Sequence, residues 1–220
     1  MTRKPAERET GSREPVAALE APRPTQAARR EVAERAILEA AKTILATRGL
    51  DELTLNEAGE FAGYSRALPA HYFKTRSALL SALADHITEG YASRLRKIVQ
   101  PDEGLEGLLK VVAFCLDDCE RDPKSIRAFQ VILGAGLTCP EVAPLVMRLN
   151  RQSVDDLGTL IRTGRDKGEV RADIRARAAA SHILASLRGV MFQWLMDPNH
   201  VPLSHVRDSL VASIRKSLAP

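Results

Sequence analysis

The fold of this chain is decided by residues 54–80, TLNEAGEFAGYSRALPAHYFKTRSALL. Thr54 and Glu57 have the spacing of a capping box, in which each side chain satisfies a free backbone N–H at the start of a helix. A helix is therefore expected to begin directly after Thr54. Gly63 supplies the positive φ that ends this helix and reverses the chain, and Ser65 offers a cap for the next one. Two short helices joined by a tight turn, followed by a longer helix, are the layout of a DNA-docking helix-turn-helix.

The charge of this segment agrees with that layout. No Asp or Glu lies between Glu60 and Asp85. The basic side chains inside this window are Arg66, His71, Lys74 and Arg76. A basic helical element without acids suits a polyanion, so the segment is a candidate DNA-binding element.

The composition of the whole chain sets wider limits. Its 220 residues suffice for one large domain or for a small domain joined to a larger one. A net charge of +4 permits nucleic acid as a partner without requiring it. Three cysteines form no paired disulfide scaffold, which favours a reducing compartment. No apolar run approaches the roughly 20 residues that cross a bilayer, and no secretory signal is visible, so we expect a cytoplasmic protein.

Apolar residues recur at helical spacing through most of the chain. Long helices are predicted from Gln26 to Thr47, ended by Gly49, and from Thr75 or Ser77 to just before Pro101. Further helices are predicted at Leu105–Cys119, Pro123–Leu133, Pro140–Arg165, Ile174–Leu195 and Leu203–Leu218. Sustained strand alternation is not found in the sequence. The predicted fold is all-α, with a helix-turn-helix domain at residues 26–74 and a larger helical domain at 75–220.

Several helix starts and the N-terminal segment carry their own signals. Pro123 and Pro140 suit the first position of a helix, and Asp173 can cap the penultimate helix. Residues 1–25 contain few large apolar side chains, so we expect a mostly disordered tail. Its basic residues are candidates for an arm in the minor groove, whereas its nearly balancing acids favour a solvated tail.

Four stretches resemble the tetracycline-repressor (TetR) family of transcriptional regulators. They are ATRGL at the end of the first helix, TLNEAGEFAGYS before the turn, SRALPAHYF as the recognition helix and KTRSALLSAL at the start of the fourth helix. This match covers roughly Ala33 to Ile87, and GRDKGEVRADIRARAAASHILASLRG with one further helix is similar to the family's dimerisation half. The resemblance implies a transcriptional regulator, typically a repressor, that binds a palindromic DNA operator as a homodimer and is released by a small-molecule effector.

The chain departs from the family pattern at two places. Ala58-Gly59 stands where the family usually has Ile-Ala, and Pro69-Ala70 stands where it has Leu-Tyr. Family members commonly place that Tyr on a DNA phosphate, a contact that Ala70 cannot make. Pro69, expected near the fourth position of the recognition helix, removes a donor and bends or tightens the first turn. We therefore expect the scaffold of the family with atypical DNA contacts.

The resemblance also implies which residues contact DNA. Arg66 is expected either to read a guanine or to hold a phosphate. The groove-facing candidates are Ala67, Leu68, Ala70 and His71, with inward packing as the alternative for Leu68. Candidates at the backbone are Thr54, Tyr72, Lys74 and Arg76, although exposed Lys and Arg are often only solvated, and Ser65 completes the set. Phe61 and Phe73 are assigned to the core of the small domain.

An effector pocket and a dimer interface are implied for the larger domain. The pocket candidates are Phe114, Phe129, Ile132, Met147, Leu160, Phe192 and Trp194, with Arg127, Gln130, Asn150 and His182 as polar anchors, and each equally suits plain core. The dimer candidates on the last two helices are Leu184, Leu187, Val190, Met191, Val206, Leu210 and Ile214. A largely apolar effector is expected to shift the helix that starts near Thr75 as a lever.

The remaining motifs are weak. Cys115 and Cys119, four apart on one helical face, suit a thiol switch or half a metal site, and equally suit small buried hydrophobes. The histidines have no paired-ligand spacing, and no phosphate loop, nucleophile elbow or carboxylate pair is present, so neither a metal, a cofactor nor an enzyme is expected. A helical ligand-binding or adaptor protein with weakened DNA recognition is the alternative function, since it would explain Pro69 and Ala70.

Overall fold

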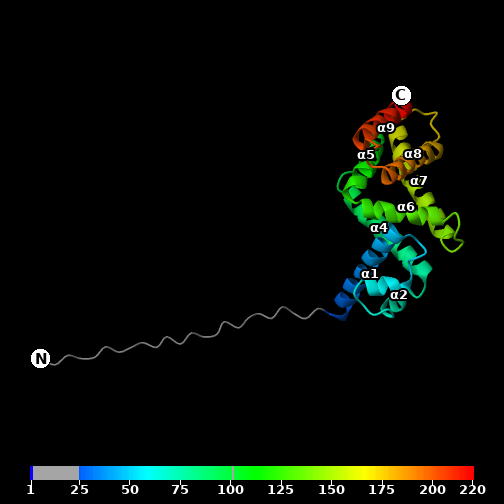
Figure 1. The fold of residues 1–220 in the computed structure, drawn as a ribbon. Helices are drawn as coiled ribbons and strands as arrows, with labels where there is room; N and C mark the ends of the chain where they lie inside the picture. The colour runs from blue at the N-terminus through cyan, green and yellow to red at the C-terminus, as the bar shows by residue number, and fades with distance from the viewer. Residues whose placement is uncertain (2–24, 101) are drawn as a thin grey trace.

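The computed structural model describes residues 1, 25–100 and 102–220, and this part of the chain is all helical (Figure 1). Its helices are α1 (Gln26–Arg48), α2 (Leu55–Phe61), α3 (Leu68–Phe73), α4 (Arg76–Leu95), α5 (Leu105–Arg121), α6 (Pro123–Ala135), α7 (Ala143–Asp166), α8 (Ala176–Met196) and α9 (Leu203–Leu218). The predicted fold class is confirmed. The tail predicted at residues 1–25 lies outside the described residues except at its ends, where Thr25 Oγ1 caps α1 by accepting from the Ala28 N–H at 3.2 Å.

Two of the predicted helix starts are wrong. α7 begins three residues after Pro140, with Pro144 in its first turn, because residues 140–142 form a turn. α8 has Arg175 at its N-cap position without a side-chain cap, and Asp173 instead forms an ion pair with Arg171 at 3.4 Å. Both predictions rested on a residue type that suits the start of a helix. The actual start also depends on the path of the preceding loop, which the sequence does not give.

The start predicted at Pro123 is confirmed. Pro123 is the first residue of α6, and Asp122 Oδ1 accepts from the Ser125 N–H at 3.2 Å. This contact satisfies one of the free donors in the first turn, while proline has no N–H to satisfy at its own position. The hydrogen bond helps to hold the pKa of Asp122 below its usual value against the opposing effect of burial.

A first hydrophobic core, here called the N-terminal core, lies among α1, α2, α3 and the first half of α4. Its fully buried large side chains from residues 37–83 are Ile37, Ile44, Leu45, Leu53, Leu79, Leu80 and Leu83. The core is completed from beyond the predicted boundary at residue 74, since Ala128 and Ile132 of α6 and Leu149 of α7 belong to the same cluster. The helix-turn-helix is thus built onto α4 and α6 rather than standing apart from them.

A second cluster, the C-terminal core, lies among α5, α7, α8 and α9. Its fully buried large side chains are Leu108, Val112, Leu116 and Ile161. The start of α5 passes very close to the end of α7: a Cβ on Gly104 would lie 2.5 Å from Gly164 Cα. Only glycine permits this approach of two backbones.

α4 connects the two cores and is fixed near both ends. Near its C-terminal end, Arg94 donates from Nε and Nη2 to the buried carboxylate of Asp118 on α5, at 3.1 and 2.5 Å. At its middle, His86 Nε2 lies 2.9 Å from Glu39 Oε1 of α1, and at its start Arg76 Nη2 donates to the Leu50 carbonyl oxygen. Figure 1 shows the consequence, an elongated molecule with α1 and α2 at one end, α5 and α9 at the other, and α4 and α6 between them.

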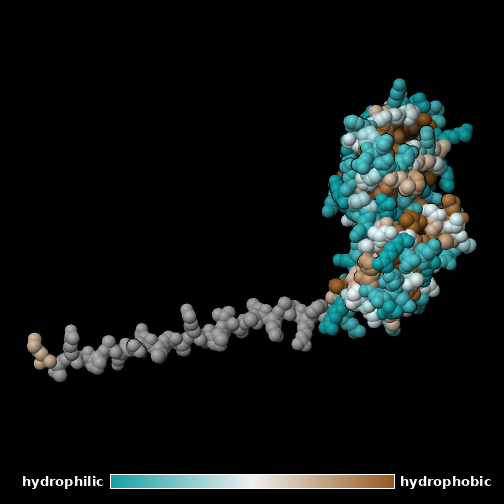
Figure 2. All heavy atoms as spheres, viewed as in Figure 1, coloured by the Kyte–Doolittle hydropathy of each residue, from teal (hydrophilic) through white to brown (hydrophobic). Residues whose placement is uncertain are grey.

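The surface is mostly hydrophilic in the view of Figure 2, with hydrophobic patches over the middle of the molecule and near the C-terminus. Among the described residues, none of the helices has the length and apolar character needed to span a bilayer.

Candidate nucleic-acid interface and ligand cavity

The turn between α2 and α3 is held by short-range hydrogen bonds. Thr54 Oγ1 accepts from the Glu57 N–H at 3.0 Å, which confirms the predicted cap of α2. The reciprocal half of the capping box is replaced, since the Glu57 carboxylate accepts from Arg48 Nη1 at 2.8 Å. Gly63 has a φ of 78°, as predicted for the residue that reverses the chain.

The recognition helix starts later than predicted, and Ser65 does not cap it. α3 begins at Leu68 with Ala67 at its N-cap position and without a side-chain cap. Ser65 contributes its carbonyl, which accepts from the Leu68 N–H at 3.1 Å. Pro69 is consequently the second residue of the helix rather than the fourth, and its missing N–H is one that has no partner within the helix anyway.

The two departures from the family pattern fit together in space. A Cβ on Gly59 would lie 2.8 Å from the Ser65 carbonyl oxygen and 2.9 Å from Cδ and Cγ of Pro69. The proline ring therefore occupies the space that a side chain at position 59 would need, and both residues are buried. Gly59 and Pro69 form one tightly packed contact between α2 and α3, so Pro69 is part of the scaffold rather than a defect in it.

The predicted groove residues are largely accessible. Arg66, Ala67, Ala70 and His71 are exposed, as are Thr54, Ser65 and Lys74 at the predicted backbone positions. Leu68 is the exception, because it is half-buried and packs against the N-terminal core. The inward alternative describes Leu68 better than the groove-facing one.

Arg66 is held by an acid at the edge of the basic window. Its Nε and Nη2 donate to the two carboxylate oxygens of Glu60 at 2.9 and 3.1 Å. This bidentate pair raises the pKa of Arg66. The guanidinium is exposed, so the same two donors are accessible to a guanine edge or a phosphate if the contact to Glu60 is exchanged.

Arg76 has a structural contact that the sequence did not indicate. Its Nη2 donates to the carbonyl oxygen of Leu50, in the loop between α1 and α2, and its Nη1 lies 3.7 Å from Glu141. The side chain is only half-exposed. Arg76 thus joins the start of α4 to that loop, and its contact with the DNA backbone stays a prediction.

The link between α3 and α4 is a strained turn that presents Lys74. Lys74 has a φ of 59° and a ψ of −41°, and the Thr75 N–H donates to the Phe73 carbonyl at 2.6 Å. A γ-turn of this hand is rare for a residue with a side chain. Phe73 is buried as predicted, and Tyr72 is half-buried with the Arg30 guanidinium 5.5 Å from its ring centre.

The assignment of Phe61 to the core is wrong. Its side chain is 47% exposed at the end of α2, and the Arg48 guanidinium lies 5.5 Å from its ring centre. The helical period places a residue on a face, but it does not show how completely a neighbouring element covers that face.

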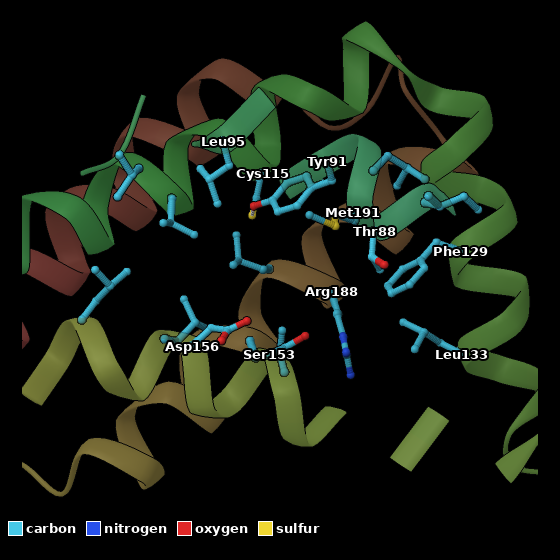
Figure 3. A pocket seen from close by; sticks show the side chains of 18 of the residues that line it. Thr88, Tyr91, Leu95, Cys115, Phe129, Leu133, Ser153, Asp156, Arg188 and Met191 are labelled. Carbon is cyan, nitrogen blue, oxygen red and sulfur yellow. Dashed lines mark hydrogen bonds between the residues drawn. The ribbon is translucent and has the colours of Figure 1, made fainter. Parts of the chain in front are cut away.

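A cavity of about 530 Å³ lies beside the C-terminal core, with walls from α4, α5, α6, α7 and α8 (Figure 3). Most of its wall is apolar. Its polar side chains include Thr88, Gln130, Ser153, Asp156 and Arg188. Tyr91 and Cys115 also line it, with the Tyr91 hydroxyl 2.7 Å from Cys115 Sγ. Burial raises the pKa of the Cys115 thiol to about 12.

The predicted pocket overlaps this cavity only in part. Phe129, Gln130 and Leu160 line it. Phe114 is buried behind Tyr91, with ring centres 5.2 Å apart, and Arg127 donates to the Leu195 carbonyl at 2.9 Å. The other predicted residues are Ile132 in the N-terminal core, Asn150 bonded to Arg188, Trp194 packed against the C-terminal core, and the exposed Met147, His182 and Phe192.

Several lining residues come from sets that sequence reasoning assigned elsewhere. Leu184, Leu187 and Met191 of the predicted dimer stripe line the cavity, and so do Tyr91 and Leu95 of α4, for which the sequence predicted no site role. The sequence shows that these residues are apolar at helical spacing. It does not show that the helices diverge here and leave space between them.

The remaining dimer candidates lie on α8 and α9. Val190, Val206 and Leu210 line a shallow open groove together with His205, Ser209 and Ser213. Ile214 is not available to a partner, because it is buried in the C-terminal core. The exposed face of α8 includes Ala178, His182, Ala185, Gly189, Phe192 and Met196.

Comparisons with known proteins identify both halves of the chain. Residues 37–83 match the family model for bacterial regulatory proteins of the tetR family, and residues 104–219 match that for the C-terminal part of BetI-type transcriptional repressors. The HTH-type transcriptional regulator BetI of Cronobacter sakazakii is 24% identical over 193 residues, which cover 86% of this chain and 92% of that protein.

Solved structures share the fold. A putative TetR-family regulator from Rhodococcus sp. superimposes with a TM-score of 0.77 at 21% identity, covering 86% of this chain and all of that one. The SmeT–triclosan complex superimposes with a TM-score of 0.73 at 19% identity, covering 86% and 92% of the two chains. The protein described here belongs to the TetR family of DNA-binding transcriptional regulators and carries a BetI-type C-terminal half.

Proposed function

We propose that this protein is a homodimeric repressor that binds a palindromic operator and is released when a small molecule enters the cavity. The observation that carries the proposal is the course of α4. Leu79, Leu80 and Leu83 in its first half are buried in the N-terminal core, whereas Thr88, Tyr91 and Leu95 line the cavity. One rigid element therefore joins the space for an effector to the helix-turn-helix.

The DNA-binding half of the proposal is supported by the exposed basic side chains around α3. Arg66, His71 and Lys74 are accessible on and beside the recognition helix. In this mode, Lys74 contacts a phosphate, and Arg66 exchanges Glu60 for a guanine edge or a phosphate. Acting on DNA as a repressor, the protein would work in the cytoplasm.

A symmetric dimer is supported by the surface of α8 and α9. Ala178, Ala185 and Gly189 form an exposed stripe of small residues on α8 that would permit close helix packing, and Phe192 is 55% exposed beside them. Four helices, two from each copy, would cover this face and place two recognition helices about 34–36 Å apart for successive major grooves.

Release by an effector requires different affinities in two states. A molecule that fills the cavity beside α4 would favour one position of that helix, and the operator would favour another. The wall is mostly apolar, as the expected effector requires. The structural relative SmeT has been solved with triclosan, which supports a small organic molecule as effector here.

Selection of bound sequences from random DNA tests the function directly, and an enriched palindrome is the expected result. On the selected site, Arg66→Ala should weaken binding by about 1–3 kcal/mol. The matched control is Arg215→Ala, which removes an exposed arginine that is also bidentate to one carboxylate, Glu106, but lies on α9. Both variants should elute as dimers in gel filtration. If the parent protein elutes as a monomer at micromolar concentration or enriches no sequence, the proposal is wrong.

A further inference from the structure

One charge on the cavity wall lacks an opposite charge. Arg188 of α8 is half-buried, and its Nη1 donates to the neutral side-chain oxygen of Asn150 on α7. In the described part of the chain, no carboxylate lies within ion-pair distance of this guanidinium. Burial, with no acidic neighbour to oppose it, lowers the pKa of Arg188.

The second arginine of the wall provides a comparison. Arg96 is exposed, and its Nη2 pairs with the Glu89 carboxylate at 2.5 Å. Its charge is therefore both solvated and balanced. Arg188 is neither fully solvated nor balanced, and a charge left in this condition is costly unless an anion reaches it.

The acid of the cavity wall is placed differently from Arg188. Asp156 is exposed, and its carboxylate accepts from Gln152 Nε2 at 2.8 Å. It needs no cation from a ligand. The two aromatic rings of the wall, Tyr91 and Phe129, stand well apart in Figure 3 and do not form a cage around a cation. The burial of the charges therefore favours a negative ligand head over a positive one.

The rest of the cavity determines the body of such a ligand. Leu95, Val99, Val111, Leu157 and Leu160 are among its apolar lining residues. Arg188, Ser153 of α7 and Leu133 of α6 all line the cavity, and Figure 3 shows Leu95 across the space from Arg188. A volume of about 530 Å³ is within the range of small-molecule sites. The site is thus apolar over most of its length, with one cationic group, Arg188, that no carboxylate of the described residues balances.

We propose that the cavity binds an ionised amphiphilic carboxylic acid, with its carboxylate on the Arg188 guanidinium and its apolar chain or ring against the leucine and valine side chains. The proposal rests on the function proposed above only in treating this cavity as the effector site. Asn150 would then position the guanidinium, since it already holds one of its N–H groups. The remaining donors of the guanidinium suit the two oxygens of a carboxylate.

Calorimetric titration of the full-length protein without DNA tests this ligand class. The probes are decanoate, 1-decanol and decyltrimethylammonium at pH 7.5, which share one chain and differ in head group. Decanoate should bind at least about tenfold more tightly than decanol, because a charge-assisted hydrogen bond contributes about 1.5–3 kcal/mol. Arg188→Met should weaken decanoate binding by about 10- to 100-fold and leave decanol binding within about twofold.

The matched control is Arg96→Met, which removes the balanced arginine of the same wall and should leave decanoate binding within about twofold. Thermal unfolding without ligand gives a second measurement: Arg188→Met should be as stable as the parent protein or more stable, since it removes a poorly compensated charge. A large loss of stability would indicate a purely structural arginine and would overturn the proposal.

The other outcomes are equally decisive. Tighter binding of decyltrimethylammonium, equal binding of decanol and decanoate, or no binding of decanoate up to its solubility limit would each exclude the amphiphilic acid. Binding of decanoate through Arg188 without any effect on a selected operator would instead leave the ligand class standing and remove the proposed release mechanism. The two proposals can therefore fail separately.

Discussion

The two cores of this protein are made from the same kind of helix but are packed differently. The N-terminal core is closed, with Leu45, Leu53, Leu79 and Leu80 almost completely buried. The C-terminal half has a comparable set of buried leucines, yet α4, α5, α6, α7 and α8 leave a cavity of about 530 Å³ among them. A closed core holds the recognition helix in one geometry, whereas an unfilled one can change when a ligand enters.

The polar contacts of the arginines also differ between the two halves. Around the helix-turn-helix, Arg48, Arg66 and Arg76 each contact a carboxylate or a carbonyl on a neighbouring element. In the cavity, Arg188 has only an amide oxygen. These three arginines of the first half have oxygen partners on neighbouring elements that include two carboxylates, whereas Arg188 has no carboxylate partner among the described residues.

The largest expected effect contrasts two leucines, one from each half. Leu45→Ala, at a side chain 1% exposed, should lower the free energy of unfolding by about 2–5 kcal/mol. Leu160→Ala should cost less than about 1.5 kcal/mol, because this half-buried side chain already faces the cavity and has fewer packing partners to lose. Urea unfolding followed by circular dichroism at one protein concentration measures both.

Trp194, the single tryptophan of the chain, packs against the C-terminal core and reports on that half by fluorescence. The contrast would be broken if Leu160→Ala proved as costly as Leu45→Ala by either signal, since the cavity would then be filled in solution.

A smaller effect is expected at the contact between α2 and α3. Gly59→Ala should destabilise the protein by about 1–3 kcal/mol, because its Cβ would overlap the Pro69 ring and the Ser65 carbonyl. The control is Gly134→Ala on α6, where a new Cβ meets no atom within 4 Å and should stabilise by up to about 1 kcal/mol.

Combining Gly59→Ala with Pro69→Ala removes the proline ring but not the Ser65 carbonyl. The losses in the free energy of unfolding from the two substitutions should therefore be less than additive in thermal or urea unfolding. Full additivity would show that position 59 and position 69 do not share one contact.

The smallest effect near neutral pH concerns the buried thiols. Burial raises the pKa of both Cys115 and Cys119 to about 12, so at pH 8 iodoacetamide should alkylate neither of them in the native protein. Half-buried Cys139 should be the reactive site, and all three should react in urea, as read by mass spectrometry.

The raised pKa values of the two thiols also predict how the free energy of unfolding depends on pH. Between about pH 8.5 and the native value of about 12, the folded protein binds more protons than the unfolded chain, so the free energy of unfolding falls as pH rises through this window. Native-state alkylation of Cys115 at pH 8 would contradict this account and would restore the thiol-switch hypothesis.

The sequence by itself determined several local features in both halves of the chain. The cap at Thr54, the reversal at Gly63 and the helix over 203–218 all follow from signals within a few residues, and the structure confirms them. Burial of Phe73 and the all-helical fold follow from apolar periodicity, which needs no knowledge of neighbours. The family resemblance then indicated a regulator, and the family models confirm it.

Only the tertiary structure decided what those helices leave between them. Phe61 proved exposed, Arg76 proved to bond the Leu50 carbonyl, and Pro69 proved to fit against Gly59, because each depends on a residue far away in sequence or around a turn. The cavity depends on the angles at which five helices meet, and helical period is identical for a packed face and an unfilled one. Leu184, Leu187 and Met191 could therefore be recognised as apolar from sequence, but not as the wall of a ligand site.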